Sequence, residues 1–159
     1  MRFVILSLSH RQPAWVDAAF EEYAKRMPRE ARLELVVLKP ESRPDGAGEQ
    51  AVDRLLEKEA QRLQAAIPPG ALVVALDERG RSLSTRDLSR TMEGWFQEGR
   101  DIAWVIGSAD GLHPGLKARA DITVSLSAMT LPHGLVRVIL AEQLYRALSL
   151  LRGHPYHRD

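Results

Sequence analysis

Small residues are concentrated in three loops, each of which follows a predicted strand. The loops are 77–80, 107–111 and 125–134, with the sequences DERG, GSADG and SLSAMTLPHG. In open α/β sheets, ligands bind beyond the carboxyl ends of the strands. Small side chains there let backbone N–H and C=O groups approach a flat ligand, as reading an adenine edge requires. A glycine in one such loop is usually only part of a turn, but three adjacent loops indicate a single pocket.

Several other kinds of site are excluded by what the chain lacks. The loop 7–13 contains no glycine, which excludes a dinucleotide fingerprint, and no Gly-Lys-Ser/Thr sequence provides a P-loop. The absence of cysteine excludes disulfides, thiolate catalysis and iron–sulfur clusters. His154 and His157 could bind a metal, but no carboxylate-rich cluster accompanies them, so no metal is expected. Ser127 lies in no Gly-x-Ser-x-Gly elbow, which favours a capping or backbone-bonding role over hydrolysis.

Arg137 and the C-terminal tail are the other candidates for chemistry. Arg137 lies on the apolar stripe of a predicted helix at 133–151, near its N-terminus, where a cation is unfavourable. It therefore needs an anionic partner, which is either an Asp or Glu in a buried ion pair or the substrate. The tail at 153–159 reads GHPYHRD, in which Tyr and His can stack on a base while Arg binds phosphate. This composition predicts a flexible or substrate-capping tail for RNA.

The elements that position these loops alternate along the chain. Predicted strands occupy 2–8, 33–38, 71–76, 102–106 and 122–126, and predicted helices occupy 13–27, 49–66, 85–98 and 133–151. The strands are almost continuously Val, Ile and Leu, which is typical of strands covered by helices on both faces. In the third helix, Ser84 and Asp87 have capping-box spacing. With 159 residues, 45% of them hydrophobic, the chain is expected to form one α/β domain over 1–159, with a mostly parallel sheet flanked by helices.

The last helix is apolar on two sides. Val138 and Ile139 lie opposite its main leucine stripe, so both sides require cover. In a domain of this size, a subunit interface is the simplest second cover, which predicts a homodimer. The alternative is a central helix in a monomer.

The net charge of +1 shows no global basic field, so RNA binding must come from a local patch. No apolar run approaches the ~20 residues needed to span a bilayer, and the N-terminus is typical of a strand rather than a signal sequence. We therefore expect a cytoplasmic protein without a membrane partner.

Motifs in the C-terminal quarter resemble a known family. They are LSAMTLPH at 126–133, LVRV at 135–138, AEQLYRA at 141–147 and HPYHR at 154–158. Together they closely resemble the small RlmH-type methyltransferases of the SPOUT class, which modify a pseudouridine at N3 in large-subunit (23S) ribosomal RNA. The resemblance runs the full length of the chain, although its N-terminal half is generic.

The resemblance implies a SPOUT-like fold with a C-terminal trefoil knot, a homodimer, and S-adenosylmethionine bound in the knot. Carried over by position, the cofactor contacts fall on Leu76, Gly107, Leu126, Ser127, Ala128, Met129, Thr130 and Leu131. These residues belong to the three strand-end regions that the glycine pattern singles out. One departure is Ser108, because the family turn usually has two glycines, and this position must therefore tolerate a side chain.

The resemblance also implies S-adenosylmethionine-dependent methyl transfer without a metal. The catalytic candidates are Arg137, His133, Tyr156, His157 and Arg158. Arg137 is expected to stabilise the substrate anion or the tail, and the tail to hold the flipped base and its phosphate. The near-neutral charge favours the assembled ribosome over naked RNA as substrate. The alternatives are a catalytically silent RNA-binding or ribosome-assembly module of the same fold, and a nucleotide-binding regulator.

Overall fold

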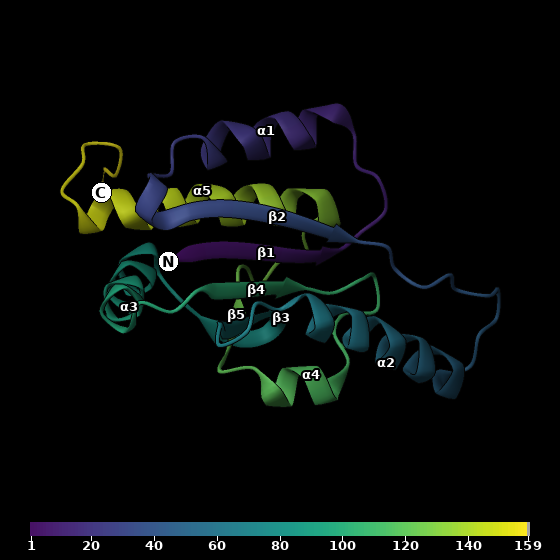
Figure 1. Cartoon of the computed structure of the whole chain (residues 1–159). Helices are drawn as coiled ribbons and strands as arrows, with labels where there is room; N and C mark the ends of the chain where they lie inside the picture. Colours follow the sequence, from purple (N-terminus) through teal and green to yellow (C-terminus); the bar gives the residue numbers. More distant parts are fainter. Residues whose placement is uncertain (159) are drawn as a thin grey trace.

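The computed structural model describes residues 1–158 and shows a five-stranded sheet between two layers of helices (Figure 1). The strands are β1 (Arg2–Leu8), β2 (Arg32–Leu38), β3 (Leu72–Ser82), β4 (Ile102–Ile106) and β5 (Ile122–Ser125). Their order is β2-β1-β4-β3-β5, and every neighbouring pair is parallel. The predicted parallel α/β domain is confirmed. Because β4, β3 and β5 are neighbours, the loops that follow them lie at one edge of the sheet.

Alternate strand residues point to opposite faces, so each face has its own core. On one face, Phe3 and Trp104 pack with α1 (Ala14–Ala24), α3 (Thr85–Glu98) and α5 (His133–Leu151). On the other, Val4 and Val105 pack with α2 (Glu49–Ala66) and α4 (Pro114–Arg119). This two-sided cover explains the continuous apolar sequence of the strands.

The helices begin and end where local chemistry dictates. α2, α3 and α5 have the predicted bounds, and the capping box of Ser84 and Asp87 is present at the start of α3. α1 ends at Ala24 instead of residue 27, and tight turns follow it, in which the Arg26 and Met27 amides each donate at 3.1 Å to the carbonyl three residues earlier. The short helix α4 is missing from the sequence prediction. It begins at Pro114, after His113, whose side chain accepts a hydrogen bond from the Gly115 amide.

β3 continues beyond its predicted end at residue 76, after an irregularity that shapes the site. Leu76 and Arg81 are both paired with Val124 of β5, so residues 77–80 bulge out of the ladder. Gly80 permits this close approach, because a Cβ there would lie 2.6 Å from the backbone carbon of Val124. Three polar residues of the bulge, Asp77, Glu78 and Arg79, line a cavity at the carboxyl edge of the sheet.

α5 packs against both α1 and α3 and contacts the sheet with its leucine stripe. Its other side leaves Val138 and Ile139 only half buried. Among residues 1–158, no helix is both long enough and apolar enough to cross a membrane. Strand order and register do not test the threading of the C-terminal segment, so the trefoil knot stays a prediction.

Candidate cofactor and active site

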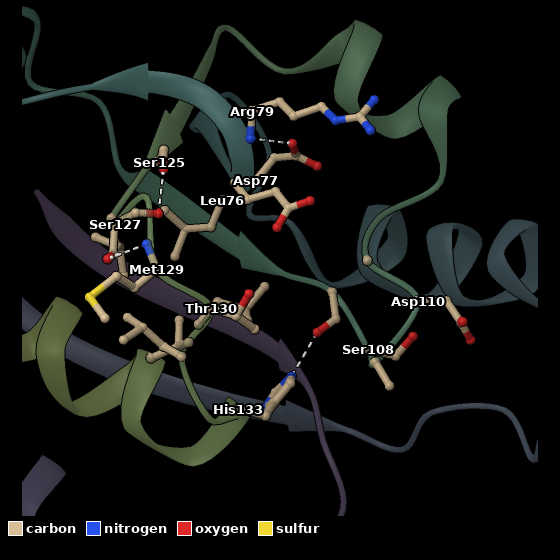
Figure 2. Close-up of a pocket in the computed structure, with 18 of the residues that line it drawn as sticks. Leu76, Asp77, Arg79, Ser108, Asp110, Ser125, Ser127, Met129, Thr130 and His133 are labelled. Carbon is tan, nitrogen blue, oxygen red and sulfur yellow. Dashed lines mark hydrogen bonds between the residues drawn. The ribbon is translucent and has the colours of Figure 1, made fainter.

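A cavity of about 630 Å³ lies at the carboxyl edge of β3, β4 and β5 (Figure 2). Its walls are the 77–80 bulge, the turn after β4, the segment after β5 and the first turn of α5. The residues lining the cavity are Leu76, Asp77, Glu78, Arg79, Ile106, Gly107, Ser108, Ala109, Asp110, Gly111, Lys117, Ser125, Leu126, Ser127, Met129, Thr130, Leu131, His133 and Val136. The single pocket that the three small-residue loops indicate is therefore present.

Seven of the eight residues predicted to contact the cofactor line this cavity. They are Leu76, Gly107, Leu126, Ser127, Met129, Thr130 and Leu131. Ala128 belongs to the same segment but is exposed and lies outside the lining. Sequence reasoning missed Lys117 and Val136, which come from helices rather than from the loops.

The 77–80 wall is fixed by a carboxylate. Asp77 accepts hydrogen bonds from the backbone amide of Arg79 at 2.9 Å and from Nζ of Lys117 at 3.0 Å. Partial burial acts to raise the pKa of Asp77, but these hydrogen bonds and the Lys117 charge outweigh it and leave the pKa below its ordinary value. The carboxylate is therefore ionised at neutral pH and ties the bulge to α4.

The turn after β4 is shaped by a close backbone approach. A Cβ on Gly107 would lie 2.4 Å from the carbonyl carbon of Gly111, so only glycine fits. The Gly111 amide donates to the Ser108 carbonyl at 2.9 Å, and Gly111 has a φ of 81°, in the left-handed region that favours glycine. The turn is thus closed on itself and presents its backbone to the cavity.

His133 supports the same turn from the start of α5. Its Nε2 donates to the Gly107 carbonyl at 2.7 Å, which places the proton on that nitrogen (Figure 2). Its Nδ1 is buried and makes no hydrogen bond within residues 1–158. The imidazole therefore lies in the cavity wall and holds a backbone carbonyl in place.

The segment after β5 is held by two serines. Ser125 Oγ donates to the Ser127 carbonyl at 3.1 Å, and the Met129 amide donates to Ser127 Oγ at 2.9 Å. The backbone-bonding role predicted for Ser127 is confirmed. The side chain of Met129 is 78% exposed. The segment therefore offers an ordered backbone and a large apolar side chain at the cavity mouth.

Arg137 lies one helical turn beyond His133 and does not line the cavity. It is only 2% exposed, and its Nε and Nη2 make no hydrogen bond in the part of the chain that the structure describes. Burial lowers its pKa, and the charge of Asp17 opposes this only in part. The predicted burial of Arg137 is confirmed. Among residues 1–158, however, Arg137 forms no ion pair with an Asp or Glu side chain.

The tail packs along the far half of α5. The Tyr156 ring lies 4.6 Å from that of Tyr145, its hydroxyl donates to Glu142 at 3.2 Å, and the Arg146 guanidinium lies 4.9 Å from its centroid. Burial and the nearby Glu142 carboxylate raise the pKa of Tyr156 to about 12. The phenol is therefore protonated at neutral pH and acts as a hydrogen-bond donor.

The structure thus separates the catalytic candidates into two groups. His133 lines the cavity and Arg137 is buried one turn further along α5, whereas Tyr156, His157 and Arg158 lie outside the cavity lining. Among residues 1–158, no group of three or more His, Cys, Asp or Glu side chains could hold a metal ion.

The sheet and its pocket define an α/β protein with a cavity at the carboxyl edge of its strands, where open parallel sheets bind their ligands. The family model described as "Predicted SPOUT methyltransferase" matches residues 1–157. The chain therefore belongs to the SPOUT methyltransferase family, as its sequence predicts. Two curated relatives, from Burkholderia ambifaria and Burkholderia multivorans, are named "Ribosomal RNA large subunit methyltransferase H". Each is 54% identical over 158 residues, which is 99% of this chain and 99% of the relative.

Solved structures agree on the fold. A probable methylase family protein from Haemophilus influenzae has a TM-score of 0.53 and 14% identity, covering 99% of this chain and 70% of its own. A putative methylase family protein from Neisseria gonorrhoeae has a TM-score of 0.52 and 16% identity, covering 91% of this chain and 81% of its own. At these identities, the likeness supports the SPOUT fold alone.

Proposed function

We propose that this methyltransferase transfers a methyl group from S-adenosylmethionine to N3 of a pseudouridine in large-subunit (23S) ribosomal RNA, with the assembled ribosome as substrate. The observation that carries the proposal is the full-length, 54% identical match to relatives named as ribosomal RNA large subunit methyltransferases. This substrate implies a cytoplasmic enzyme.

The volume and lining of the cavity support the binding of S-adenosylmethionine. Its volume of about 630 Å³ lies within the range of roughly 300–1,000 Å³ for small-molecule pockets. Leu76, Leu126 and Leu131 supply apolar surface for the adenine ring, and the Gly107 turn supplies backbone polar groups. A Cβ at Gly107 would force the backbone of this wall to move. These residues, with Ser127, Met129 and Thr130, would hold the cofactor.

When bound, S-adenosylmethionine supplies a methyl group on a sulfonium centre. The chain's own tasks are to align the pseudouridine N3 with that group and to stabilise the anion that forms when N3 gives its proton to solvent; the carbon–sulfur bond of the methyl group would break as the bond to N3 forms. His133 keeps the Gly107 turn in place with its Nε2 proton. Nε and Nη2 of Arg137 are buried donors without acceptors among residues 1–158, which suits binding of the substrate anion or of the tail. Tyr156, protonated at neutral pH, donates a hydrogen bond instead of removing a proton.

We further propose that the enzyme is a homodimer. Trp15 of α1 is 58% exposed, and Val138 and Ile139 of α5 are half buried, so apolar surface remains on the α1 and α5 side of the sheet. The measurement is molar mass in solution by light scattering. A mass of one chain would refute the dimer.

The tail can be assigned to one subunit by mixing variants. In the proposed dimer, the tail that reaches a pocket belongs either to the same chain, after leaving α5, or to the second copy. Mixed dimers of Gly107→Ala and a chain truncated after Gly153 regain methyl transfer only if pocket and tail come from different subunits. Absence of recovery, with mixed dimers shown to form, would place both in one chain.

The primary test is incorporation of labelled methyl from S-adenosylmethionine into ribosomes that lack the modification, with mass spectrometry locating the product nucleoside. We expect one N3-methylpseudouridine, and far less product on protein-free RNA. Incorporation at another nucleoside would reject the proposed substrate. Cofactor binding without incorporation would favour a nucleotide-binding regulator, and no cofactor binding would favour the silent RNA-binding module.

A further inference from the structure

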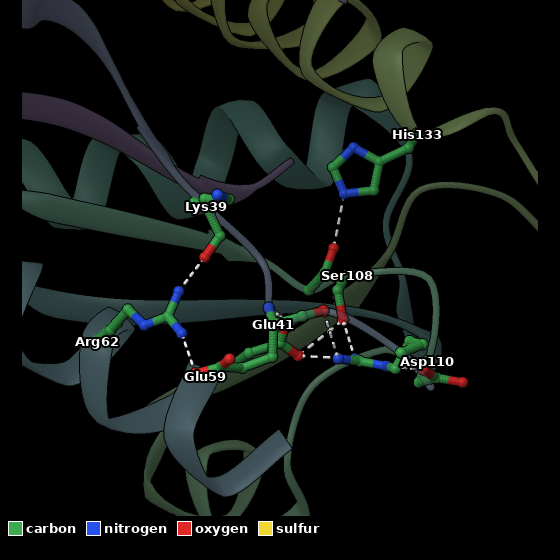
Figure 3. A network of polar contacts seen from close by, with 9 residues as sticks. Lys39, Glu41, Glu59, Arg62, Ser108, Asp110 and His133 are labelled. Carbon is green, nitrogen blue, oxygen red and sulfur yellow. Dashed lines mark hydrogen bonds and ion pairs between the residues drawn. The ribbon is translucent and has the colours of Figure 1, made fainter. Parts of the chain in front are cut away.

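A polar network connects the loop 39–48 to the cavity turn after β4 (Figure 3). At its centre is Glu59, in the middle of α2, whose side chain is only 1% exposed. Glu59 Oε1 accepts from Arg43 Nη2 and from Ser108 Oγ, both at 2.9 Å. Its Oε2 accepts from the Glu41 amide at 3.0 Å. One buried carboxylate therefore binds both the loop and the turn.

Arg43 makes the second connection between the same two segments. Its Nε donates to the Asp110 carboxylate at 2.6 Å, and its Nη2 donates to Ser108 Oγ at 2.9 Å. Its Nη1 donates to the Glu41 carbonyl at 3.0 Å, which fixes the loop backbone around the guanidinium. A planar guanidinium suits this arrangement because its five donors have fixed directions. Arg43 therefore spans the turn from Ser108 to Asp110.

Neither Glu59 nor Arg43 lines the cavity, but every contact they make to the turn is with a residue that does. On the cavity side, the same turn is held by His133 through the Gly107 carbonyl. The turn is thus fixed from two sides. The side chain of Ser108, at the position where a glycine was expected, has a defined use, because its hydroxyl accepts from Arg43 and donates to Glu59.

We propose that Glu59 and Arg43 are positioning residues that act through Ser108 to keep the 107–111 turn in the shape that cofactor binding requires. This inference rests on the proposed use of S-adenosylmethionine. It predicts that residues outside the cavity control the dissociation constant for the cofactor. A merely structural network would change the melting temperature and leave that constant unaltered.

Glu59→Gln is the first variant, because it keeps the shape of the side chain. Three donors converge on the two Glu59 oxygens, from Glu41, Arg43 and Ser108. A Gln has one acceptor oxygen, so in either orientation its NH₂ group faces at least one of these donors. Arg43→Gln is the second variant, and it lies in the more exposed loop, so it tests the same idea if Glu59→Gln does not fold.

The matched control is Arg62→Gln. Arg62 also belongs to α2 and binds the same loop, through the Lys39 carbonyl and the Glu41 carboxylate. It makes no hydrogen bond to the 107–111 turn in the part of the chain that the structure describes. Its replacement therefore loosens the loop without removing a direct connection to the cavity wall.

The experiment is titration calorimetry of each full-length variant with S-adenosylmethionine, combined with thermal unfolding and methyl transfer. We expect Glu59→Gln and Arg43→Gln each to raise the dissociation constant about tenfold. The turnover number at saturating cofactor stays within about twofold, and Arg62→Gln changes the dissociation constant less than about twofold. An unchanged dissociation constant in folded Glu59→Gln or Arg43→Gln would overturn the inference. Absence of binding by the unmodified protein would instead refute the proposed cofactor.

A double-mutant cycle shows whether the effect passes through Ser108. If Glu59 acts on the turn through this hydroxyl, Ser108→Ala and Glu59→Gln together weaken binding less than the product of their separate effects. Independent, multiplicative effects would overturn the assignment of Ser108 as the connection.

Discussion

Gly107→Ala is the substitution that most directly tests the cavity wall. Its Cβ would lie 2.4 Å from the Gly111 carbonyl carbon, 2.5 Å from its oxygen and 2.8 Å from the Leu112 nitrogen. Ordinary contacts of a Cβ begin near 3.4 Å, so backbone must move by about 1 Å. All three atoms are backbone, and no side-chain rotation relieves the clash.

The movement has two expected costs. Overpacking of this kind destabilises a protein by about 2 kcal/mol, which lowers the melting temperature of a domain of this size by about 6 °C. A displacement of about 1 Å in a positioned site reduces activity on the order of 100-fold. We therefore expect a folded protein in which methyl transfer falls on the order of 100-fold, S-adenosylmethionine binds more weakly by calorimetry, and the melting temperature is moderately lower.

Gly94→Ala in α3 is the matched control, because nothing lies within 4 Å of its added Cβ. There the helix gains about 0.5–1 kcal/mol, so the melting temperature rises slightly and cofactor binding is unchanged. The reasoning would be refuted if Gly107→Ala bound the cofactor as well as Gly94→Ala does.

Three further predictions concern charged and titrating groups. Arg137→Met removes a buried cation, so we expect the melting temperature to stay unchanged or to rise by about 3 °C. We also expect loss of methyl transfer. A large fall in the melting temperature would show that the guanidinium has an anionic partner in the folded protein. Asp77 has a lowered pKa, so its contribution to stability is present above about pH 4 and is lost as the pH falls through the folded value. Asp77→Asn therefore lowers the melting temperature by about 3 °C at pH 7, and this difference must shrink toward pH 3. The pKa of Tyr156 is raised to about 12, whereas an ordinary tyrosine titrates near pH 10, so in ultraviolet titration Tyr156→Phe must lose almost no ionisation between about pH 9 and 11 relative to the unmodified protein.

The strands and long helices could be predicted because their buried faces require apolar residues at regular spacings or in continuous runs in the sequence. The burial of Arg137 follows from its place on the leucine stripe, for the same reason. α4 could not be predicted, because its six residues span fewer than two turns and begin with Pro114 and Gly115. β3 is longer than expected because the bulge separates its last residues from the apolar run.

In the site, too, local features could be predicted from the sequence and contacts between distant residues could not. The positions of Gly107 and Leu76 follow from strand ends and small residues, which are local signals. The contacts of Arg43 with Ser108 and Asp110 join residues 65 and 67 positions apart, and no periodicity records such pairs. Lys117 was missed because it comes from the unpredicted α4. The sheet order, with β4 between β1 and β3, is likewise a long-range property.

α5 also acts as a spacer between the cavity and the tail. His133 begins the helix beside Gly107, and Leu151 ends it 18 residues later, about 27 Å away at the rise of an α-helix. One residue inserted between His133 and Tyr145 would rotate the rest of the helix and the tail by about 100° relative to the cavity, so Tyr156 would keep its contact with Tyr145 but face another direction. The length of α5 therefore fixes both how far the tail lies from the cavity and which way the tail faces.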